Sequence, residues 1–296
     1  MSSLALKVKV LPVEMLTGFW SPDIFPATLT RMWTLNEQPN TPQPAHLPGV
    51  SHVLAVASGK GGVGKSTTAV NLALAMARAG LAVGLLDADI YGPNVPVMMG
   101  SKVQPEMDET RGMIPVERFG VKFISLGLIA GDGVPIVWRG PMLAKMLSQF
   151  LHDVAWAPLD CLLIDLPPGT GDVQLTLAQS VAISGALIVT TPQEIALEDV
   201  RRGIRMFETV NVPVMGILEN MSYYICPSCD KKHAIFAEGG GRKTADHFEV
   251  PFLGEVPLSP ALRAASDTGS PLVDPSDPVA IVYNEIAQNV IGRLAN

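Results

Sequence analysis

The chain has 296 residues, of which 48% are hydrophobic and 17% are charged, and its formal net charge at pH 7 is -7. This composition allows a substantial core and excludes extensive disorder. The acidic balance argues against a protein held on nucleic acid by phosphate contacts, which would need a basic face. Asp, Lys, Gly or Pro interrupts every apolar run before it reaches the roughly 18 residues that span a bilayer, so we expect a soluble protein without stable membrane insertion.

The three cysteines, Cys161, Cys226 and Cys229, are too few and too unevenly spaced for the disulfide framework of a small secreted protein. Residues 1–48 lack both the apolar core of a secretory signal and the arginine-rich, acid-poor composition of a transit peptide. We therefore expect a cytoplasmic protein, with the mitochondrial matrix as the alternative. The proline-rich end of this segment predicts a linker, which divides the chain into an N-terminal extension, 1–48, and one domain, 49–296.

The stretch GKGGVGKST, which runs from Gly59 to Thr67, fits the G-x-x-x-x-G-K-[ST] pattern of a phosphate-binding loop, or P-loop. The apolar residues 53–57 before it predict a buried strand, and residues 68–79 after it predict a helix. Glycines let backbone N–H groups approach an anion, Lys65 adds a positive charge, and the Ser66 hydroxyl can bind magnesium. The pattern therefore predicts a nucleoside triphosphate site, and a chance glycine turn before a helix is the weaker alternative.

Two further apolar runs end in carboxylates. Residues 81–86 predict a buried strand followed by Asp87 and Asp89, and residues 159–166 predict another strand with Asp165 near its end. The carboxyl ends of parallel strands face the ligand crevice, so we predict that Asp87 and Asp165 hold magnesium. We expect Asp89 to orient the attacking water, because an Asp with an ordinary pKa of about 3.9 is a weak base at neutral pH. For Asp87 and Asp89, the alternative is that they merely cap the turn that follows them.

Strand and helix patterns alternate through the rest of the chain, which predicts an α/β fold with a doubly wound, mostly parallel sheet and helices on both faces. The loop 167–172 is rich in glycine and is expected to move with the γ-phosphate. Glu219 and Asn220 end a later strand and should line the same crevice. The amide of Asn220 suits the edge of an adenine, with a turn-forming role as the alternative.

Cys226 and Cys229 form a C-x-x-C pair, and His233 follows four residues later. Two thiolates can bind one metal site but do not complete a tetrahedral zinc site or an iron-sulfur cluster. A symmetric dimer would supply four thiolates on its two-fold axis. A zinc site within one chain that includes His233, or a redox dithiol, are the alternatives. Cys161 lies inside a predicted strand and is interpreted as a buried packing residue.

Lys60, directly after the first glycine of the loop, makes the stretch similar to the variant P-loop of the MinD-type ATPases. This resemblance implies that Lys60 reaches across a dimer interface toward the nucleotide of the partner. A solvated lysine is the alternative.

The motifs GKGGVGKST, LLDADIYGPN, WRGP, DLPPGTGD, TTPQE, ENMS and C-x-x-C together resemble the Mrp/ApbC family of ATP-binding iron-sulfur cluster carriers, which includes NUBPL-like proteins. The resemblance covers the chain from about Gly49 onward. It implies a homodimer with Mg²⁺ and ATP, and a [4Fe-4S] cluster that Cys226 and Cys229 of both chains hold for transfer to apo iron-sulfur proteins. The implied nucleotide contacts are Lys60, Gly61, Gly62, Val63, Gly64, Lys65, Ser66, Thr67, Asp89, Asp165 and Asn220.

Two other function classes fit the sequence less well than a cluster carrier. A MinD- or ParA-type positioning ATPase, which recruits partners to a membrane or DNA, would need a basic helix or face, but the terminal helix pattern, 277–294, offers one cation, Arg293. A metabolic P-loop kinase would need an acceptor-substrate site, for which the sequence shows no pattern. The cysteine pair favours the carrier.

Overall fold

The structure is a computed structural model that describes residues 44–89, 92–130, 140–271 and 274–295. These residues belong to one compact unit. The unit includes residues ahead of Gly49, because Ala45 forms a bridge with Val181 and Leu47 is buried. Residues 1–43 of the predicted extension, and Trp138 and Arg139 of the WRGP motif, lie outside the described residues.

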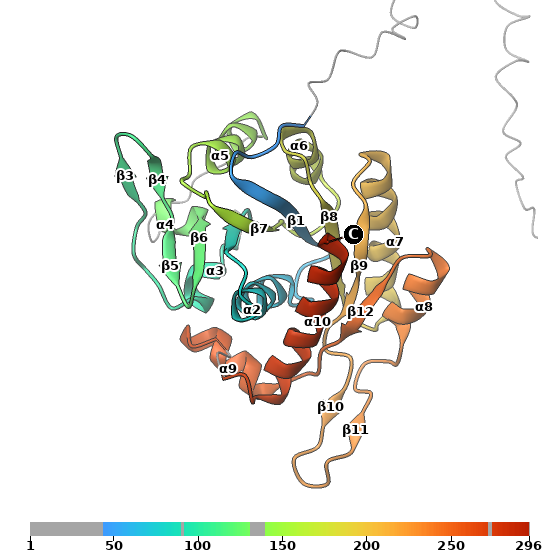
Figure 1. Ribbon diagram of the computed structural model, residues 1–296. Helices are drawn as coiled ribbons and strands as arrows, with labels where there is room; N and C mark the ends of the chain where they lie inside the picture. Colours follow the sequence, from blue (N-terminus) through green and yellow to red (C-terminus); the bar gives the residue numbers. More distant parts are fainter. Residues whose placement is uncertain (1–43, 90–91, 131–139, 272–273, 296) are drawn as a thin grey trace, which may run out of the picture. The chain divides into compact units, whose positions relative to one another are not determined.

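An eight-stranded sheet forms the centre of the unit (Figure 1), in the order β12-β9-β8-β1-β7-β2-β6-β5. Every neighbouring pair is parallel except β5 and β6. This arrangement confirms the predicted mostly parallel α/β sheet. The strands are β1 (Val50–Ser58), β2 (Val83–Asp87), β5 (Val116–Arg118), β6 (Val121–Ser125), β7 (Leu159–Asp165), β8 (Gly185–Thr190), β9 (Val214–Glu219) and β12 (Phe252–Glu255).

Helices cover both faces of the sheet, as the sequence predicted. Along β1, Leu54 and Val56 point into one core, which α2 and α10 complete, while Val53 and Ala55 point into the other, beneath α5, α6 and α7. This alternation explains why the strand is an uninterrupted apolar run. The helices are α2 (Lys65–Arg78), α3 (Val95–Met98), α4 (Leu126–Ala130), α5 (Gly140–His152), α6 (Asp172–Ser180), α7 (Glu194–Thr209), α8 (Gly240–His247), α9 (Pro260–Thr268) and α10 (Pro278–Leu294).

The terminal helix α10 packs on the domain. The Asp277 carboxylate caps its start by accepting hydrogen bonds from the N–H groups of Val279 and Ala280. Tyr283 and Ile286 lie in the core beside α2, and the Tyr283 hydroxyl is 3.4 Å from the Thr68 hydroxyl. No helix within the described ranges has the length and apolar character needed to cross a bilayer.

Two hairpins lie outside the main sheet. The first consists of β3 (Glu106–Asp108) and β4 (Gly112–Ile114), which pair in antiparallel fashion between β2 and β5 in the chain. The second, β10 (Tyr224–Ile225) with β11 (Lys232–His233), projects from the body of the domain (Figure 1). It carries the C-x-x-C pair and connects β9 to α8.

Candidate functional site

The glycine loop between β1 and α2 has the backbone shape of a phosphate cradle. Gly62 and Gly64 have φ values of 81° and 84°, in the left-handed region that favours glycine. An added Cβ at Gly64 would lie 2.1 Å from Asn220 Nδ2, so the loop admits no side chain there. The N-cap of α2 is Gly64, which makes no side-chain cap hydrogen bond, and the first turn from Lys65 onward contains no acidic residue. The first N–H groups of the helix are therefore available to an anion.

Lys65 is almost fully buried and contacts two of the predicted carboxylates. Its Nζ lies 2.6 Å from Asp165 Oδ1, 3.8 Å from Asp89 Oδ2 and 3.3 Å from the Ser66 hydroxyl. Burial raises the pKa of Asp165, and the charge of Lys65 opposes that rise. The structure thus brings four predicted site residues together at the ends of β2 and β7.

The oxygen atoms beside Lys65 are suitable ligands for Mg²⁺. Asp89 Oδ1 and Asp165 Oδ2 are buried and have no hydrogen-bond partner within the part of the chain that is described. Buried carboxylate oxygens of this kind need a cation or a donor, and Mg²⁺ prefers such oxygen ligands. The Ser66 hydroxyl adds a third oxygen beside them.

Asp87 is engaged by protein donors. It pairs in register with Asp165 across β2 and β7 and is fully buried. Its carboxylate accepts hydrogen bonds from the Ser125 hydroxyl at 2.8 Å and from the N–H groups of Asp89 at 3.1 Å and Val95 at 3.3 Å. Burial, followed by the charge of Asp165, raises the pKa of Asp87 to about 8. The magnesium role of Asp87 stays a prediction, while its hold on the Asp89 backbone is a feature that sequence reasoning missed.

Asn220 contacts the loop rather than open solvent. Its Nδ2 donates a 2.8 Å hydrogen bond to the Val63 carbonyl, and the residue is 3% exposed. Its backbone N–H donates to the Thr190 carbonyl. The adenine contact that the sequence suggested for Asn220 stays a prediction.

The loop after β7 is tied down by a residue that sequence reasoning missed. Gln174 is buried, and its Nε2 donates to the carbonyls of Pro167 and Gly169. Its Oε1 accepts from the N–H of Gly171, as expected for a glutamine three residues into α6. A Gln three positions after the last glycine of DLPPGTG was the available signal. The predicted motion of this loop with nucleotide is untested.

Lys60 and its neighbours form the rim of the cradle. Gly61 and Gly62 are exposed, while Gly59, Lys60 and Thr67 are half-buried. The Ser58 hydroxyl donates to the Lys60 carbonyl and fixes the start of the loop. The cross-dimer role of Lys60 stays a prediction.

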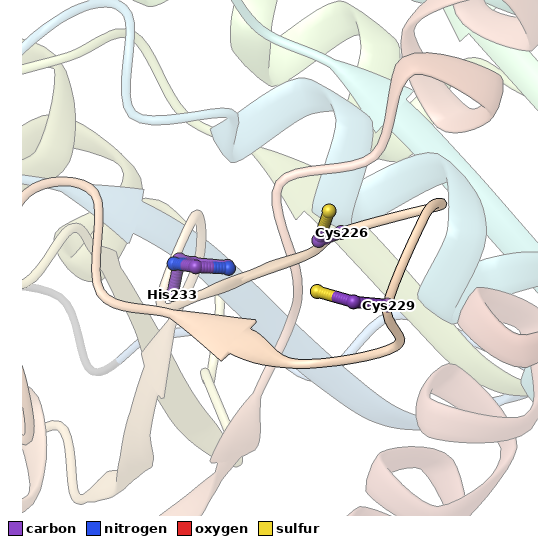
Figure 2. A group of neighbouring side chains, drawn as sticks. All are labelled: Cys226, Cys229 and His233. Atoms are coloured by element: carbon purple, nitrogen blue, oxygen red, sulfur yellow. The ribbon is translucent and has the colours of Figure 1, made fainter.

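The hairpin β10–β11 brings together the three metal-ligating side chains that the sequence identified (Figure 2). The two Sγ atoms and one imidazole nitrogen of Cys226, Cys229 and His233 all lie within 4.8 Å of one another. The turn is closed by the N–H of Asp230, which donates to the Cys226 carbonyl, and by the N–H of Cys226, which donates to the Lys231 carbonyl.

The two hairpin thiols differ from Cys161 in chemistry. The backbone N–H of Ser228 and the thiol of Cys229 lower the pKa of Cys226, because they stabilise its thiolate. Cys226 is half-buried and Cys229 is exposed, so both can reach a metal. Burial raises the pKa of Cys161 to about 12, and this thiol lies in the core, which confirms its predicted packing role.

The fold agrees with comparisons to known proteins. The family described as "ParA: NUBPL iron-transfer P-loop NTPase" matches residues 49–291. The chain belongs to this family. A Pseudomonas fragi relative named "Iron-sulfur cluster carrier protein" is 49% identical over 250 residues, which are 82% of this chain and 87% of the relative. An Arabidopsis thaliana relative named "Iron-sulfur protein required for NADH dehydrogenase, mitochondrial" is 49% identical over 84% of this chain and 80% of its own length.

Solved structures are also similar in fold to this member of the NUBPL family. A nucleotide-binding protein from Archaeoglobus fulgidus, whose structure contains ADP, has a TM-score of 0.70 and 38% identity, over 80% of this chain and 93% of its own. The cell division ATPase MinD from Pyrococcus furiosus has a TM-score of 0.59 and 20% identity, over 82% of this chain and 99% of its own, which shows the fold alone.

Proposed function

We propose that the chain is an ATP-hydrolysing carrier that holds a [4Fe-4S] cluster between two copies of itself and delivers it to apo iron-sulfur proteins. The observation that carries this proposal is the presence, in one compact unit, of a phosphate cradle and a projecting hairpin with two thiols and an imidazole. The names of the relatives, which describe iron-sulfur cluster carriers, support it. Free thiols in this number suit a reducing compartment, such as a bacterial cytoplasm or a mitochondrial matrix.

For nucleotide binding, Lys65 moves from Asp165 to the β- and γ-phosphate oxygens. The exchange replaces one charged partner with another, so the lysine is never buried alone. Asp165 and the Ser66 hydroxyl then provide oxygen ligands for Mg²⁺. Bound Mg²⁺ supplies neutralisation of the negative charge on the transferring phosphoryl group.

For hydrolysis, Asp89 orients the attacking water. Its backbone N–H is held by the Asp87 carboxylate, and Asp87 is held in turn by Ser125, so the position of Asp89 is fixed from beneath. Lys60 lies on the rim of the cradle, where it can meet the nucleotide of a partner chain. ATP then becomes part of the dimer interface, and hydrolysis changes the interface that carries the cluster.

For the cargo, Cys226 and Cys229 act as thiolate ligands. Each chain offers two thiolates, and two chains related by a two-fold axis offer the four that a [4Fe-4S] cluster needs. The lowered pKa of Cys226 favours its ligand form at neutral pH. Because the hairpin projects from the domain, the cluster site is accessible both to a second chain and to a recipient protein.

One observation favours a second candidate, a mononuclear metal site within a single chain. The ligand atoms of Cys226, Cys229 and His233 already lie within 4.8 Å of one another, and all three belong to one hairpin. Two sulfurs and one nitrogen, with water as the fourth ligand, suit Zn²⁺. In this case the chain would bind one metal ion per monomer and would not need the dimer.

A positioning ATPase is less well supported. The helix α10 packs in the core beside α2, and its cation Arg293 is not joined by the basic cluster that membrane recruitment would need. The low identity to MinD carries no functional argument.

Anaerobic reconstitution with iron and sulfide, followed by chemical analysis and native mass spectrometry, tests the proposal. We expect four iron and four sulfide atoms per two chains, with mass that corresponds to a dimer. His233→Ala should keep this stoichiometry, because the bridged cluster uses thiolates. One metal ion per monomer without sulfide, lost in His233→Ala, would support the mononuclear site and contradict the carrier.

A further inference from the structure

A single buried carboxylate holds both ends of the segment that contains the metal-ligating hairpin. Glu219, the last residue of β9, is fully buried. Its Oε1 accepts a 2.6 Å hydrogen bond from the hydroxyl of Ser222, just before β10. Its Oε2 accepts a 2.5 Å hydrogen bond from the N–H of Gly241, in the first turn of α8. Glu219 is therefore hydrogen-bonded to both ends of the segment 222–241, which contains the hairpin.

We call the two hydrogen bonds of Glu219 the clamp, with Ser222 on its entry side and Gly241 on its exit side. The backbone on the exit side packs closely against Glu219. An added Cβ at Gly241 would lie 2.9 Å from Glu219 Oε2 and 3.1 Å from Glu219 Cβ. The N-cap of α8 is Gly239, which has no side chain to accept a hydrogen bond, so Glu219 supplies the acceptor that a helix start needs. On the entry side, the Ser222 N–H donates to the Val256 carbonyl. The base of the hairpin is thus positioned by Glu219 and hydrogen-bonded to Val256, the residue that follows β12.

The next residue in the chain contacts the phosphate cradle. Asn220 Nδ2 donates to the Val63 carbonyl at 2.8 Å. This carbonyl and the Gly64 N–H belong to one planar trans peptide group, in which the two point in opposite directions. The hydrogen bond from Asn220 therefore sets the direction in which the Gly64 N–H faces a phosphate.

We propose that Glu219 and Asn220 couple the phosphate cradle to the metal hairpin, with Glu219 as a positioning residue for the hairpin. The proposal rests on the proposed function, since it requires that both a nucleotide and a metal bind. A phosphate that engages the Gly64 N–H fixes the Val63 peptide and with it Asn220. Glu219 directly precedes Asn220 in the chain, so a shift of Asn220 moves Glu219. Through its two hydrogen bonds, Glu219 transmits this shift to Ser222 and Gly241. By linkage, a metal on the hairpin changes the nucleotide affinity by the same factor.

The test compares the affinity for Mg²⁺ and AMPPNP, by calorimetry, between metal-free protein and protein loaded anaerobically with Co²⁺. We expect the two dissociation constants of the wild type to differ about fivefold or more. In Glu219→Gln the ratio should fall to within about twofold of one, because the amide cannot accept hydrogen bonds on both sides. The Co²⁺ stoichiometry and the affinity of the metal-free variant should stay within about threefold of wild type, since the ligands and cradle are intact.

Glu255→Gln is the matched control. Glu255 pairs in register with Glu219 on β12, but its carboxylate lies 3.9 Å from the exposed Arg242, so we expect a wild-type ratio. Ser222→Ala removes one arm of the clamp and should reduce the ratio even if Glu219→Gln does not fold. A wild-type ratio of one, or an unchanged ratio in a folded Glu219→Gln and in Ser222→Ala, overturns the proposal. If the wild type binds no AMPPNP, or binds neither Co²⁺ nor a reconstituted iron-sulfur cluster, the proposed function fails, and this proposal with it.

Discussion

Replacement of Lys65 by alanine should affect both the nucleotide-free fold and nucleotide binding. In the nucleotide-free protein, Lys65 Nζ lies 2.6 Å from Asp165, which is fully buried. Removal of one partner from a buried ion pair costs about 3–5 kcal/mol of stability. Asp165 can relieve part of this cost by taking a proton, because burial raises its pKa. We expect a loss of about 3 kcal/mol at pH 7.5, and a smaller loss as the pH falls.

The expected loss of ATP affinity in Lys65→Ala follows from the contacts that the lysine exchanges. Hydrogen bonds to charged groups contribute about 1.5–3 kcal/mol each, so contacts to two phosphate oxygens contribute about 3–6 kcal/mol. The wild type must first release Lys65 from Asp165, and this reduces the net benefit. We therefore expect the lower end, about 3 kcal/mol, which is a loss of affinity of about 10²-fold.

Calorimetric titration with Mg²⁺ and ATP measures the affinity, and urea unfolding without nucleotide measures the stability. Lys122→Ala is the control, because the Lys122 ammonium donates to the Trp156 carbonyl at the opposite, amino end of the sheet. It should leave the ATP affinity unchanged. A folded Lys65→Ala protein whose ATP affinity is within about threefold of wild type would refute the assignment of the cradle.

Three further predictions concern the carboxylates and the loop. Asp89→Ala should bind ATP but hydrolyse it about 10²-fold more slowly in a phosphate-release assay, because water positioning is lost; wild-type turnover would exclude the role. Gly64→Ala should weaken ATP binding at least about tenfold in the same titration, since its φ is 84° and its Cβ would meet Asn220. The pKa of Asp87 is raised from 3.8 to about 8, so the folded state binds more protons than the unfolded state between these values. The unfolding free energy without Mg²⁺ should therefore fall between pH 5 and 8; a rise across this range would contradict the burial argument.

Much of the sheet could be predicted because its central strands are continuous apolar runs that end in carboxylates or glycines. The β2 and β7 strands follow this pattern closely, and the structure places them as neighbours. The helix α6 was missed, because most of its nine residues, DVQLTLAQS, are polar and Leu177 is its fully buried apolar residue. The two-residue strands of the metal hairpin are too short to show a periodic pattern.

The residues of the cradle could be predicted from spacing, but their contacts could not. The ion pair between Lys65 and Asp165 joins residues 100 positions apart, and it depends on the order of strands in the sheet. The sequence placed Glu219 and Asn220 together at the crevice. In the structure their side chains diverge, one to the base of the hairpin and one to the cradle, because neighbouring residues at a strand end face opposite sides.

The iron content of cysteine variants after anaerobic reconstitution tests the central claim most directly. If the cluster bridges two chains, symmetry makes Cys226→Ser or Cys229→Ser remove two of the four thiolates at once, and serine is a poor replacement. Each variant should lose nearly all its iron and sulfide while it keeps the ATP affinity of the cluster-free wild type. Cys161→Ser, in the core, should keep the cluster. A Cys226→Ser protein with wild-type iron, or a Cys161→Ser protein without it, would contradict the account.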